Sequence, residues 1–368
     1  MIRSIKNLLA ALILLSLVLN PMDLVHASRG VPGSAEFGFG ADIYPDEPYV
    51  DQALQMAGEL DLDWIQVHIT WSSIQPEAGQ PLRMERIDPI MAFAAQRGIA
   101  VMFSLTGTPT WARTGTGPDT ALTAQLVTAL AMTYPGTLQA VELFPGANTL
   151  SGWGARPDPQ AYTNLYRICA DRLQQSGISI LLVAAGLRPA DLAQGDMHDL
   201  TYLDGLYKAG AASAIPVISL RFENVTGAPS VFPDSQNPGV LRHYEEIRQV
   251  MTRNDHHSGL IWITHLGSLS GKISATDSAY LDMNMQSNWM ALAYRQLRTQ
   301  LYIGVTFGQS INPGQGGSDA GSFSLIEPSG GTHPFYSVLR EMISLNNTGS
   351  VSLLPGKSKE GNLAKMRP

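Results

Sequence analysis

Four titratable side chains fall at the ends of β-rich apolar runs, the positions where a parallel sheet gathers its functional groups. Three are carboxylates, Asp42, Glu142 and Glu223, and the fourth is the imidazole of His265. Two carboxylates held close together can divide acid and nucleophile roles between them, and an imidazole exchanges a proton near neutral pH. The sequence therefore offers groups for acid–base chemistry, provided that the fold brings these strand ends together.

Three tryptophans, Trp71, Trp111 and Trp153, occupy the same kind of position, at strand ends or in the loops that follow. Flat apolar rings beside polar groups suit the faces of sugars, whose CH groups stack while their hydroxyls form hydrogen bonds. Each ring alone would serve equally well to pack a loop onto the scaffold. Three such rings at one end of a fold favour a ligand groove there.

The elements that must position these residues alternate regularly along the chain. Apolar β-rich runs and amphipathic stretches follow one another from residue 37 to residue 345, and several runs are continuously apolar, as expected of parallel strands covered on both faces. Eight strand–helix pairs predict an α/β fold, a single-domain (β/α)8 TIM barrel, with an open doubly wound sheet as the alternative. The open sheet usually carries a glycine-rich phosphate loop, and the segment from Gly38 to Gly40 lacks the third glycine. The predicted strands cover residues 37–44, 64–71, 99–105, 138–144, 178–185, 215–222, 260–264 and 301–307.

The N-terminal residues have the order of a secretory signal peptide. Arg3 and Lys6 give a positive start, residues 8–19 are an unbroken apolar run, and residues 25–27 form a small-x-small cleavage pattern. The run is shorter than the roughly 20 residues that span a bilayer, although a retained N-terminal anchor is the alternative. We therefore predict a secreted or extracytoplasmic protein. Its predicted parts are a signal peptide at 1–27, an exposed segment at 28–35, the barrel at 36–346 and a disordered polar tail at 347–368.

Composition excludes several classes of function. The net charge of −7 and the lack of a large Lys/Arg cluster argue against nucleic acid, and no later segment is apolar enough to cross a membrane. The single cysteine, Cys169, is expected to be buried and inert, and it cannot form an internal disulfide. No metal-ligand spacing is present, since His256 and His257 are expected in a solvated loop, and no cofactor is implied. The oligomeric state is not indicated.

Six motifs follow one another along the chain. They are WSSIQP at 71–76 with Gly79, PTWA at 109–112, ELFPGAN at 142–148, DPQAY at 158–162, WITHLG at 262–267, and residues 325–331 followed by PFY at 334–336. In this order they resemble clan A of the glycoside hydrolases, the retaining barrel enzymes that include xylosidases and endoglucanases. The resemblance spans nearly the whole mature chain and implies an oligo- or polysaccharide ligand. The implied ligand contacts are Trp71, Trp111, Glu142, Asn148 and Trp153.

The catalytic positions depart from the clan pattern. The clan uses a general acid/base after strand four and a nucleophile at the end of strand seven, two carboxylates about 5–5.5 Å apart. By motif alignment these positions hold Gly146 and His265. Gly146 has no side chain to move a proton, and an imidazole would form a charged adduct in place of an ester. Because loss of acid/base assistance alone costs about 10²–10⁴ in rate, the resemblance implies carbohydrate binding without efficient hydrolysis.

Two other functions remain open. An active glycoside hydrolase could use relocated carboxylates, with Glu223 and Asp42 as candidates because both sit at strand ends. Glu142 is expected deeper in the barrel wall, as a structural carboxylate paired with a basic group such as Arg188. Alternatively, the chain is a non-catalytic surface or interaction protein that has kept only the scaffold, since fold does not fix function.

Overall fold

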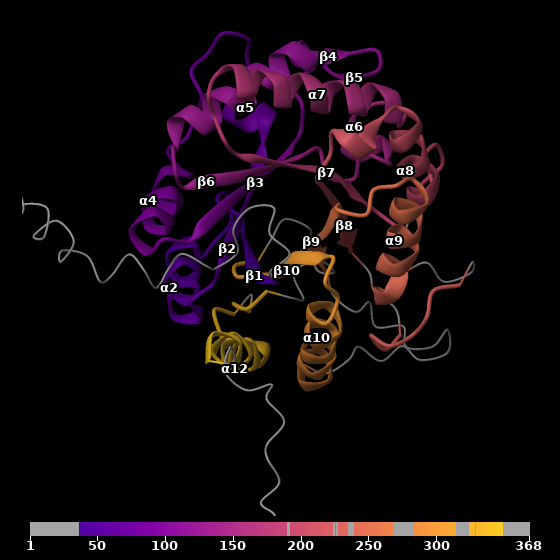
Figure 1. The fold of residues 1–368 in the computed structure, drawn as a ribbon. Coiled ribbons are helices and arrows are strands. Elements are labelled where there is room, and N and C mark those ends of the chain that lie inside the picture. Colours follow the sequence, from indigo (N-terminus) through magenta and orange to yellow (C-terminus); the bar gives the residue numbers. More distant parts are fainter. Residues whose placement is uncertain are drawn as a thin grey trace, which may run out of the picture.

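Eight parallel strands close into a barrel in the computed structural model of the protein (Figure 1). The structure describes residues 37–189, 192–223, 225, 227–234, 239–267, 283–313, 324–327 and 329–348. The order around the barrel is β1-β10-β9-β8-β7-β6-β3-β2, so barrel strands that follow one another in the chain are neighbours and the last pairs with the first. The predicted (β/α)8 TIM barrel is confirmed. Its strands are β1 Gly38–Ile43, β2 Trp64–Thr70, β3 Ala100–Thr106, β6 Leu138–Leu143, β7 Leu181–Leu187, β8 Val217–Phe222, β9 Leu260–Leu266 and β10 Ile303–Ser310.

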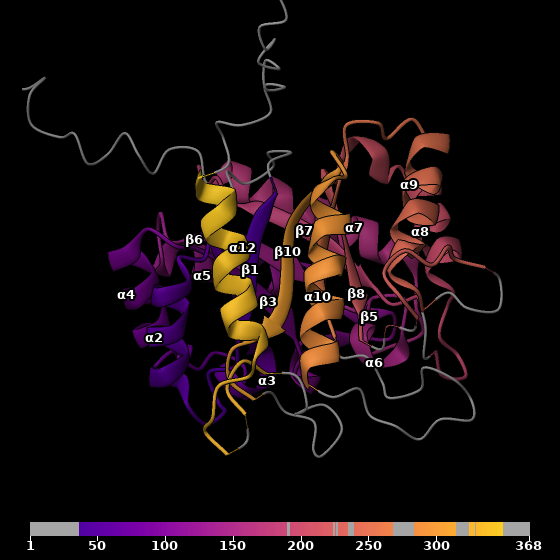
Figure 2. The ribbon, with the colours of Figure 1, turned by 90° about the horizontal axis from the view of Figure 1, so that it is seen from below.

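Helices cover the outside of the barrel, and Figure 2 shows α10 and α12 standing beside β10 and β1. Two helices begin where the sequence supplies a cap. The Asp119 carboxylate accepts a hydrogen bond from the Leu122 amide at the start of α5, and Asp158 does the same for two amides of α7. The helices are α2 Val50–Leu60, α3 Trp71–Ile74, α4 Asp88–Arg97, α5 Thr120–Thr133, α6 Leu150–Trp153, α7 Pro159–Gln175, α8 Asp199–Lys208, α9 Tyr244–Arg253, α10 Met283–Arg298 and α12 Phe335–Thr348, with short 3-10 turns at Thr110–Ala112, Ala211–Ser213 and Leu241–His243.

The inside of the barrel is apolar toward the amino ends of the strands. Trp64 packs edge-to-face on Trp262, with ring centroids 5.1 Å apart. Gly40 has no side chain, and the Phe307 ring occupies the space that a Cβ there would need. These rings close the barrel by packing, so no channel passes through it at this level. We call this group the apolar floor; it consists of Trp64, Met102, Ala140, Val183, Val217, Leu260, Trp262, Val305 and Phe307.

Polar side chains replace the apolar ones toward the carboxyl ends of the strands. His68 pairs laterally with Ser104, and Ser104 with Glu142, so three neighbouring strands present polar groups at one level. We call this end the polar mouth; it consists of Asp42, His68, Ser104, Glu142, Arg188, Arg221, Glu223, Thr264 and His265. The carboxyl end of the strands is where barrels of this class carry their functional groups.

A second apolar core lies between the strands and the outer helices. Tyr162 on α7 donates a hydrogen bond to the Leu143 carbonyl at 2.8 Å and accepts one from the Ala185 amide at 2.6 Å, which ties α7 to two strands. Cys169, on the same helix, is fully buried, as predicted. Burial raises the pKa of its thiol to about 12, so the thiolate is absent at neutral pH.

Local structure differs from the sequence predictions in several places, and β10, Ile303–Ser310, is shifted from the predicted 301–307. The predicted strand at 178–185 is β7, Leu181–Leu187, because the chain continues through an irregular register past Ala185, whose φ is 79°. A hairpin of β4 Arg113–Thr114 and β5 Gly117–Pro118 was not predicted, since two-residue strands show no periodicity. The solvated loop expected around His256 is wrong for that residue, which is buried with its Nδ1 2.9 Å from the Tyr207 hydroxyl.

Several predictions concern segments outside the described residues. These are the signal peptide at 1–27, the segment at 28–35 and the tail predicted at 347–368, apart from its first two residues, which end α12; all three stay predictions. Among the described helices, none combines the length and apolar character needed to cross a membrane.

Candidate functional site

Glu142 lies at the base of the polar mouth and joins three strands. From β6, its Oε2 accepts a hydrogen bond from Ser104 Oγ on β3 at 2.8 Å. Its Oε1 accepts one from Thr264 Oγ1 on β9 at 2.5 Å, and the side chain is fully buried. The predicted pairing of Glu142 with Arg188 is wrong, because hydroxyls of the barrel wall contact both carboxylate oxygens and Arg188 contacts Glu223 instead.

Asp42 lies between two imidazoles. Its Oδ2 is 3.2 Å from His68 Nε2 and 3.5 Å from His265 Nδ1, and the side chain is buried. Burial acts to raise the pKa of the Asp42 carboxyl, but hydrogen bonds and charge interactions with His265 and His68 outweigh it, so the pKa lies below its usual value. Tyr44 stacks on the His68 ring with centroids 4.2 Å apart. Asp42 is therefore an anion at neutral pH, and it fixes the direction of both imidazoles.

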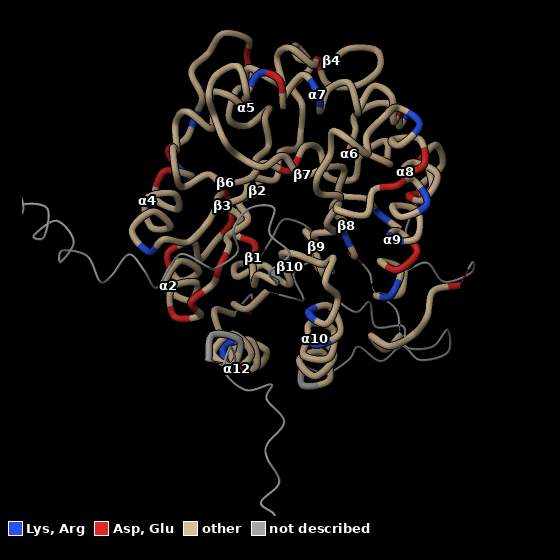
Figure 3. Tube along the Cα trace, in the orientation of Figure 1, with Lys and Arg blue, Asp and Glu red and all other residues tan. Residues whose placement is uncertain are grey.

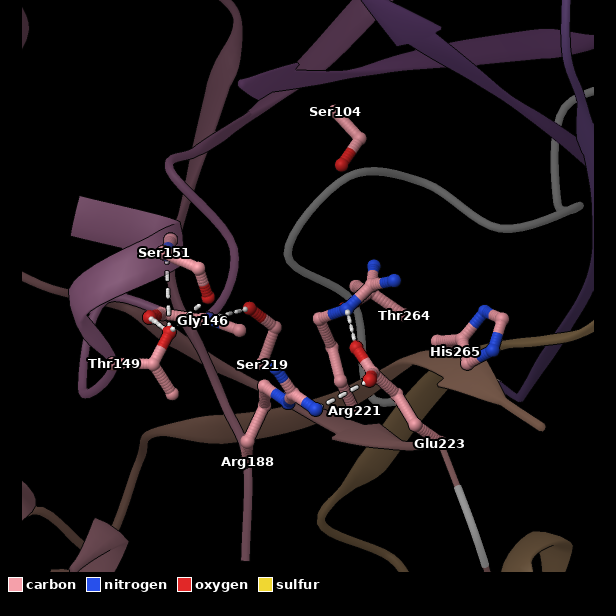
Figure 4. Close-up of polar contacts among 12 residues, drawn as sticks. Ser104, Gly146, Thr149, Ser151, Arg188, Ser219, Arg221, Glu223, Thr264 and His265 are labelled. Atoms are coloured by element: carbon pink, nitrogen blue, oxygen red, sulfur yellow. Dashed lines mark hydrogen bonds and ion pairs between the residues drawn. The ribbon is translucent and has the colours of Figure 1, made fainter. Parts of the chain in front are cut away.

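Glu223 is held by two arginines (Figure 4). Arg188 Nη2 lies 2.6 Å from Glu223 Oε2, and Arg221 Nε lies 3.6 Å from Oε1. Burial acts to raise the pKa of Glu223, but the charges of Arg221 and Arg188 lower it by more than burial raises it. The pKa of Glu223 therefore lies below its usual value. Glu223 keeps 32% of its side chain exposed, whereas Asp42 keeps 1%. Among Asp42, Glu142 and Glu223, it is therefore Glu223 that a ligand can reach.

Gly146 lies in a tight turn after β6. Its φ is 79°, its N–H donates to the Gly186 carbonyl at 2.8 Å, and its carbonyl accepts from the Thr149 amide and hydroxyl, each at 2.8 Å. A Cβ here would meet Thr149 Oγ1 at 3.3 Å and the Arg188 side chain at 3.5 Å. The left-handed backbone strains any other residue at this position. The turn itself, and not only the residue type, therefore disfavours a carboxylate side chain at this position.

The three tryptophans differ in how much of each ring a ligand can reach. Trp71 and Trp153 are buried, with 1% and 2% of their surfaces exposed. Trp111 is half-buried; its indole N–H donates to the Pro76 carbonyl at 3.1 Å, and its ring meets Trp71 edge-to-face with centroids 5.6 Å apart. Trp111 is thus the ring of the three that offers surface to a ligand as the site stands.

Asn148 is buried and directs its amide group at the backbone after β7. Its Nδ2 donates to the carbonyls of Arg188 and Met197 at 3.0 and 2.9 Å, and its Oδ1 accepts from the Arg188 amide at 3.0 Å. Asn148 therefore positions the chain that carries Arg188. Ligand contacts through Asn148, Glu142, Trp71 or Trp153 require these groups to become exposed, and they stay predictions.

A cavity of about 170 Å³ opens beside His68. It lies between the end of β2, the short helix α3 and residues 83–87. Its polar lining includes Asp46, His68, Thr70, Ser73, Arg83 and Arg86. Donors and acceptors on several sides of a small cavity suit a ligand with many hydroxyls.

The structure brings Asp42, Glu223 and His265 to one end of the barrel, as the sequence predicted. Two-carboxylate hydrolysis needs one acid whose pKa is raised enough to hold a proton. Neither Asp42 nor Glu223 meets this requirement, because the pKa of each is lowered. Within the described part of the chain, no group of three or more metal-ligating side chains is placed to hold an ion. The arrangement can orient and hydrogen-bond a ligand, but these two carboxylates cannot donate a proton at neutral pH.

Sequence reasoning missed the functional place of His68 and Arg221. Both are titratable residues inside largely apolar strands, β2 and β8, and they lie near the carboxyl ends. Polar residues at such positions inside a barrel strand are themselves a signal of the mouth. Arg188 was assigned to Glu142, although it directly follows β7 and so reaches the rim rather than the base.

The sequence matches no protein-family model and no curated protein. The fold is similar to that of solved glycoside hydrolases. A family 39 enzyme from the gut symbiont Bacteroides cellulosilyticus superposes with a TM-score of 0.64 at 14% identity, over 86% of this chain and 64% of that one. Xylanase 10B from Thermotoga petrophila, in complex with xylobiose, gives 0.58 at 12% identity, over 85% and 95% of the two chains. A family 39 β-xylosidase from Caulobacter crescentus gives 0.54 at 16% identity, over 86% and 73%. Similarity at these identities establishes a shared barrel fold with family 10 and family 39 glycosidases.

Proposed function

We propose that this protein binds carbohydrate at the polar mouth of its barrel and does not hydrolyse it by the two-carboxylate route. The proposal rests on which residues occupy the polar mouth and on how their charged groups are paired. By the motif alignment, Gly146 and His265 correspond to the clan's two catalytic positions, and the reachable carboxylate, Glu223, is ion-paired with Arg188. The scaffold resembles that of glycosidases, and one similar structure holds xylobiose. The motifs around the mouth support the same ligand class.

The charge states of Asp42 and Glu223 support binding without hydrolysis by the two-carboxylate route. A leaving sugar oxygen needs a proton, and assistance of this kind contributes about 10²–10⁴ in rate. Asp42 and Glu223 are both anions at neutral pH, and the turn at Gly146 has no room for a third carboxyl without strain. Binding requires none of these protons. It needs only exposed ring surface, offered by Trp111, and polar groups around it.

The test is a paired measurement on the purified full-length chain. Calorimetric titration with xylo- and cello-oligosaccharides measures binding, while the appearance of shorter oligosaccharides, followed by chromatography, measures hydrolysis of a bond whose leaving oxygen needs a proton. We expect saturable binding and no turnover above the buffer rate. Trp111→Ala should weaken binding about 2–10-fold, the effect of losing one aromatic contact. Tyr302→Ala is the matched control, because Tyr302 is half-buried at the opposite end of the barrel, just before β10.

Two outcomes would overturn the proposal. Turnover that disappears in Glu223→Gln would favour the relocated pair of Glu223 and Asp42. Absence of binding to every glycan, with a folded protein, would favour a surface or interaction role for the barrel. The signal pattern of residues 1–27 further supports export, which N-terminal sequencing of secreted protein would test.

A further inference from the structure

Two arginines converge on one carboxylate at the rim of the mouth. Arg188 follows β7 and Arg221 lies in the neighbouring β8, so adjacent strands deliver both guanidinium groups to Glu223 (Figure 4). The contact of Arg188 is short, at 2.6 Å, while the Arg221 contact is loose, at 3.6 Å. Glu223 therefore forms a closer ion pair with Arg188 than with Arg221.

The guanidinium pair has hydrogen-bond donors left over. A guanidinium presents several N–H groups in a planar fork, and it has no acceptor. Arg188 Nε and Arg221 Nη1 are buried, and neither has a hydrogen-bond partner among the residues that the structure describes. Leaving a buried charged donor without an acceptor destabilises a structure, so these two atoms call for an oxygen that the protein itself does not supply.

The partly exposed charged groups at this rim are two arginines and one glutamate, although the chain as a whole is acidic. Two guanidinium groups face one carboxylate, and all three side chains are partly exposed, at 21%, 12% and 32% for Arg188, Arg221 and Glu223. Asp42 and Glu142 interact with Arg221 electrostatically, but both are fully buried. On the outer helices α8 and α9, by contrast, acidic and basic residues are interspersed (Figure 3).

We propose that Arg188 and Arg221 form a subsite for the carboxylate of an acidic sugar, so that the preferred ligand is a uronate-containing oligosaccharide. This inference rests on the proposed carbohydrate binding. A carboxylate matches the planar fork of a guanidinium in two parallel hydrogen bonds, which a neutral hydroxyl cannot do. Glu223 occupies this position when no ligand is bound, and it competes with the ligand for the same donors.

The test compares ligands that differ in charge and share a backbone. Trigalacturonate is titrated against its methyl ester, and a glucuronate-substituted xylo-oligosaccharide against the unsubstituted one, with a sulfated oligosaccharide as a separate arm for sulfate in place of carboxylate. We expect the acidic member of each pair to bind about tenfold more tightly, as expected for charge-assisted hydrogen bonds. The preference should shrink as salt is raised, because part of the attraction is exposed to solvent.

Variants separate this subsite from a structural ion pair. Arg188→Gln and Arg221→Gln should each remove the preference for the acidic ligand, and Arg188→Gln covers the case in which the more buried Arg221 is needed for folding. Glu223→Gln should strengthen binding of the acidic ligand relative to the neutral one, because the internal competitor is gone. Arg253→Gln is the control, since Arg253 forms an exposed pair with Asp204 at the end of α9 far from the mouth.

The outcomes distinguish the two proposals. Equal binding of acidic and neutral ligands, or weaker acidic binding in Glu223→Gln, overturns the acidic subsite while neutral binding that depends on Trp111 upholds the proposed function. A tenfold preference for the sulfated arm over both carboxylates also overturns it. If no ligand of either kind binds to the folded protein, both proposals fail.

Discussion

The apolar floor and the polar mouth belong to the same eight strands, yet they are stabilised in different ways. In the floor, Trp64, Trp262 and Phe307 fill the barrel by volume. In the mouth, one or two specific contacts hold each polar group, as Ser104 and Thr264 hold Glu142. A tightly packed floor supports a mouth whose side chains are placed for a ligand rather than for packing, which is the division expected of a barrel with a site at one end.

The largest effect on stability should come from removing a large side chain from the apolar floor. Trp262→Ala removes a fully buried ring that packs against Trp64, and it should lower the free energy of unfolding by about 3–5 kcal/mol, since the surroundings cannot collapse into the space. Urea unfolding followed by circular dichroism measures this loss. Leu301→Ala, at an 86% exposed position, should change it by less than about 0.5 kcal/mol. Equal losses in the two variants would show that the floor contributes no special stability.

A smaller effect should come from the mouth turn. Gly146→Ala puts a Cβ on a residue with φ of 79° and brings it to 3.3 Å from Thr149 Oγ1, so the protein should lose about 1–2 kcal/mol. Gly115→Ala is the matched control, because a Cβ there meets no atom within 4 Å. If Gly146→Ala is as stable as the wild type, the turn imposes no restriction, and the missing carboxylate reflects residue choice alone.

The finest test concerns the pH dependence of stability. The pKa of Asp42 in the folded state lies below the ordinary value of 3.8 for an aspartate carboxyl, so the folded state binds fewer protons than the unfolded state in acid. The stabilising contribution of Asp42 is complete above that value and is lost as pH falls through the folded pKa. Urea midpoints measured from pH 6 to pH 3 should therefore fall more steeply for the wild type than for Asp42→Asn. Parallel curves would contradict the ion pairing of Asp42 with His68 and His265.

The floor and the strand order could be predicted from the sequence because both depend on repeated patterns. Continuous apolar runs such as 99–105 and 138–144 define parallel strands without regard to any one contact. Predicted ends deviated at β7, where Ala185 and Gly186 take positive φ values that a hydrophobic pattern does not reveal. The β4–β5 hairpin was not predicted because a strand of two residues is too short to show an alternating pattern.

The mouth could be predicted only in part. The sequence predicted Asp42, Glu223 and His265 at the carboxyl end of the barrel, because each follows or ends an apolar run. The partners of each group depend instead on which strands face one another across the barrel. That is why Glu142 was paired with Arg188 in the prediction, whereas Thr264 from the opposite wall contacts it. Trp71 and Trp153 were located correctly, yet their burial follows from side-chain direction and loop packing, which spacing does not encode.

The single cysteine can report how often the folded protein opens locally. Cys169 is the only thiol in the chain, and it lies on the buried face of α7 with its pKa raised to about 12, so a maleimide or disulfide reagent in the medium meets no reactive sulfur in the folded protein. Modification must wait until α7 separates from the strands behind it. The rate at which label accumulates at low denaturant therefore counts these opening events directly, without any engineered probe.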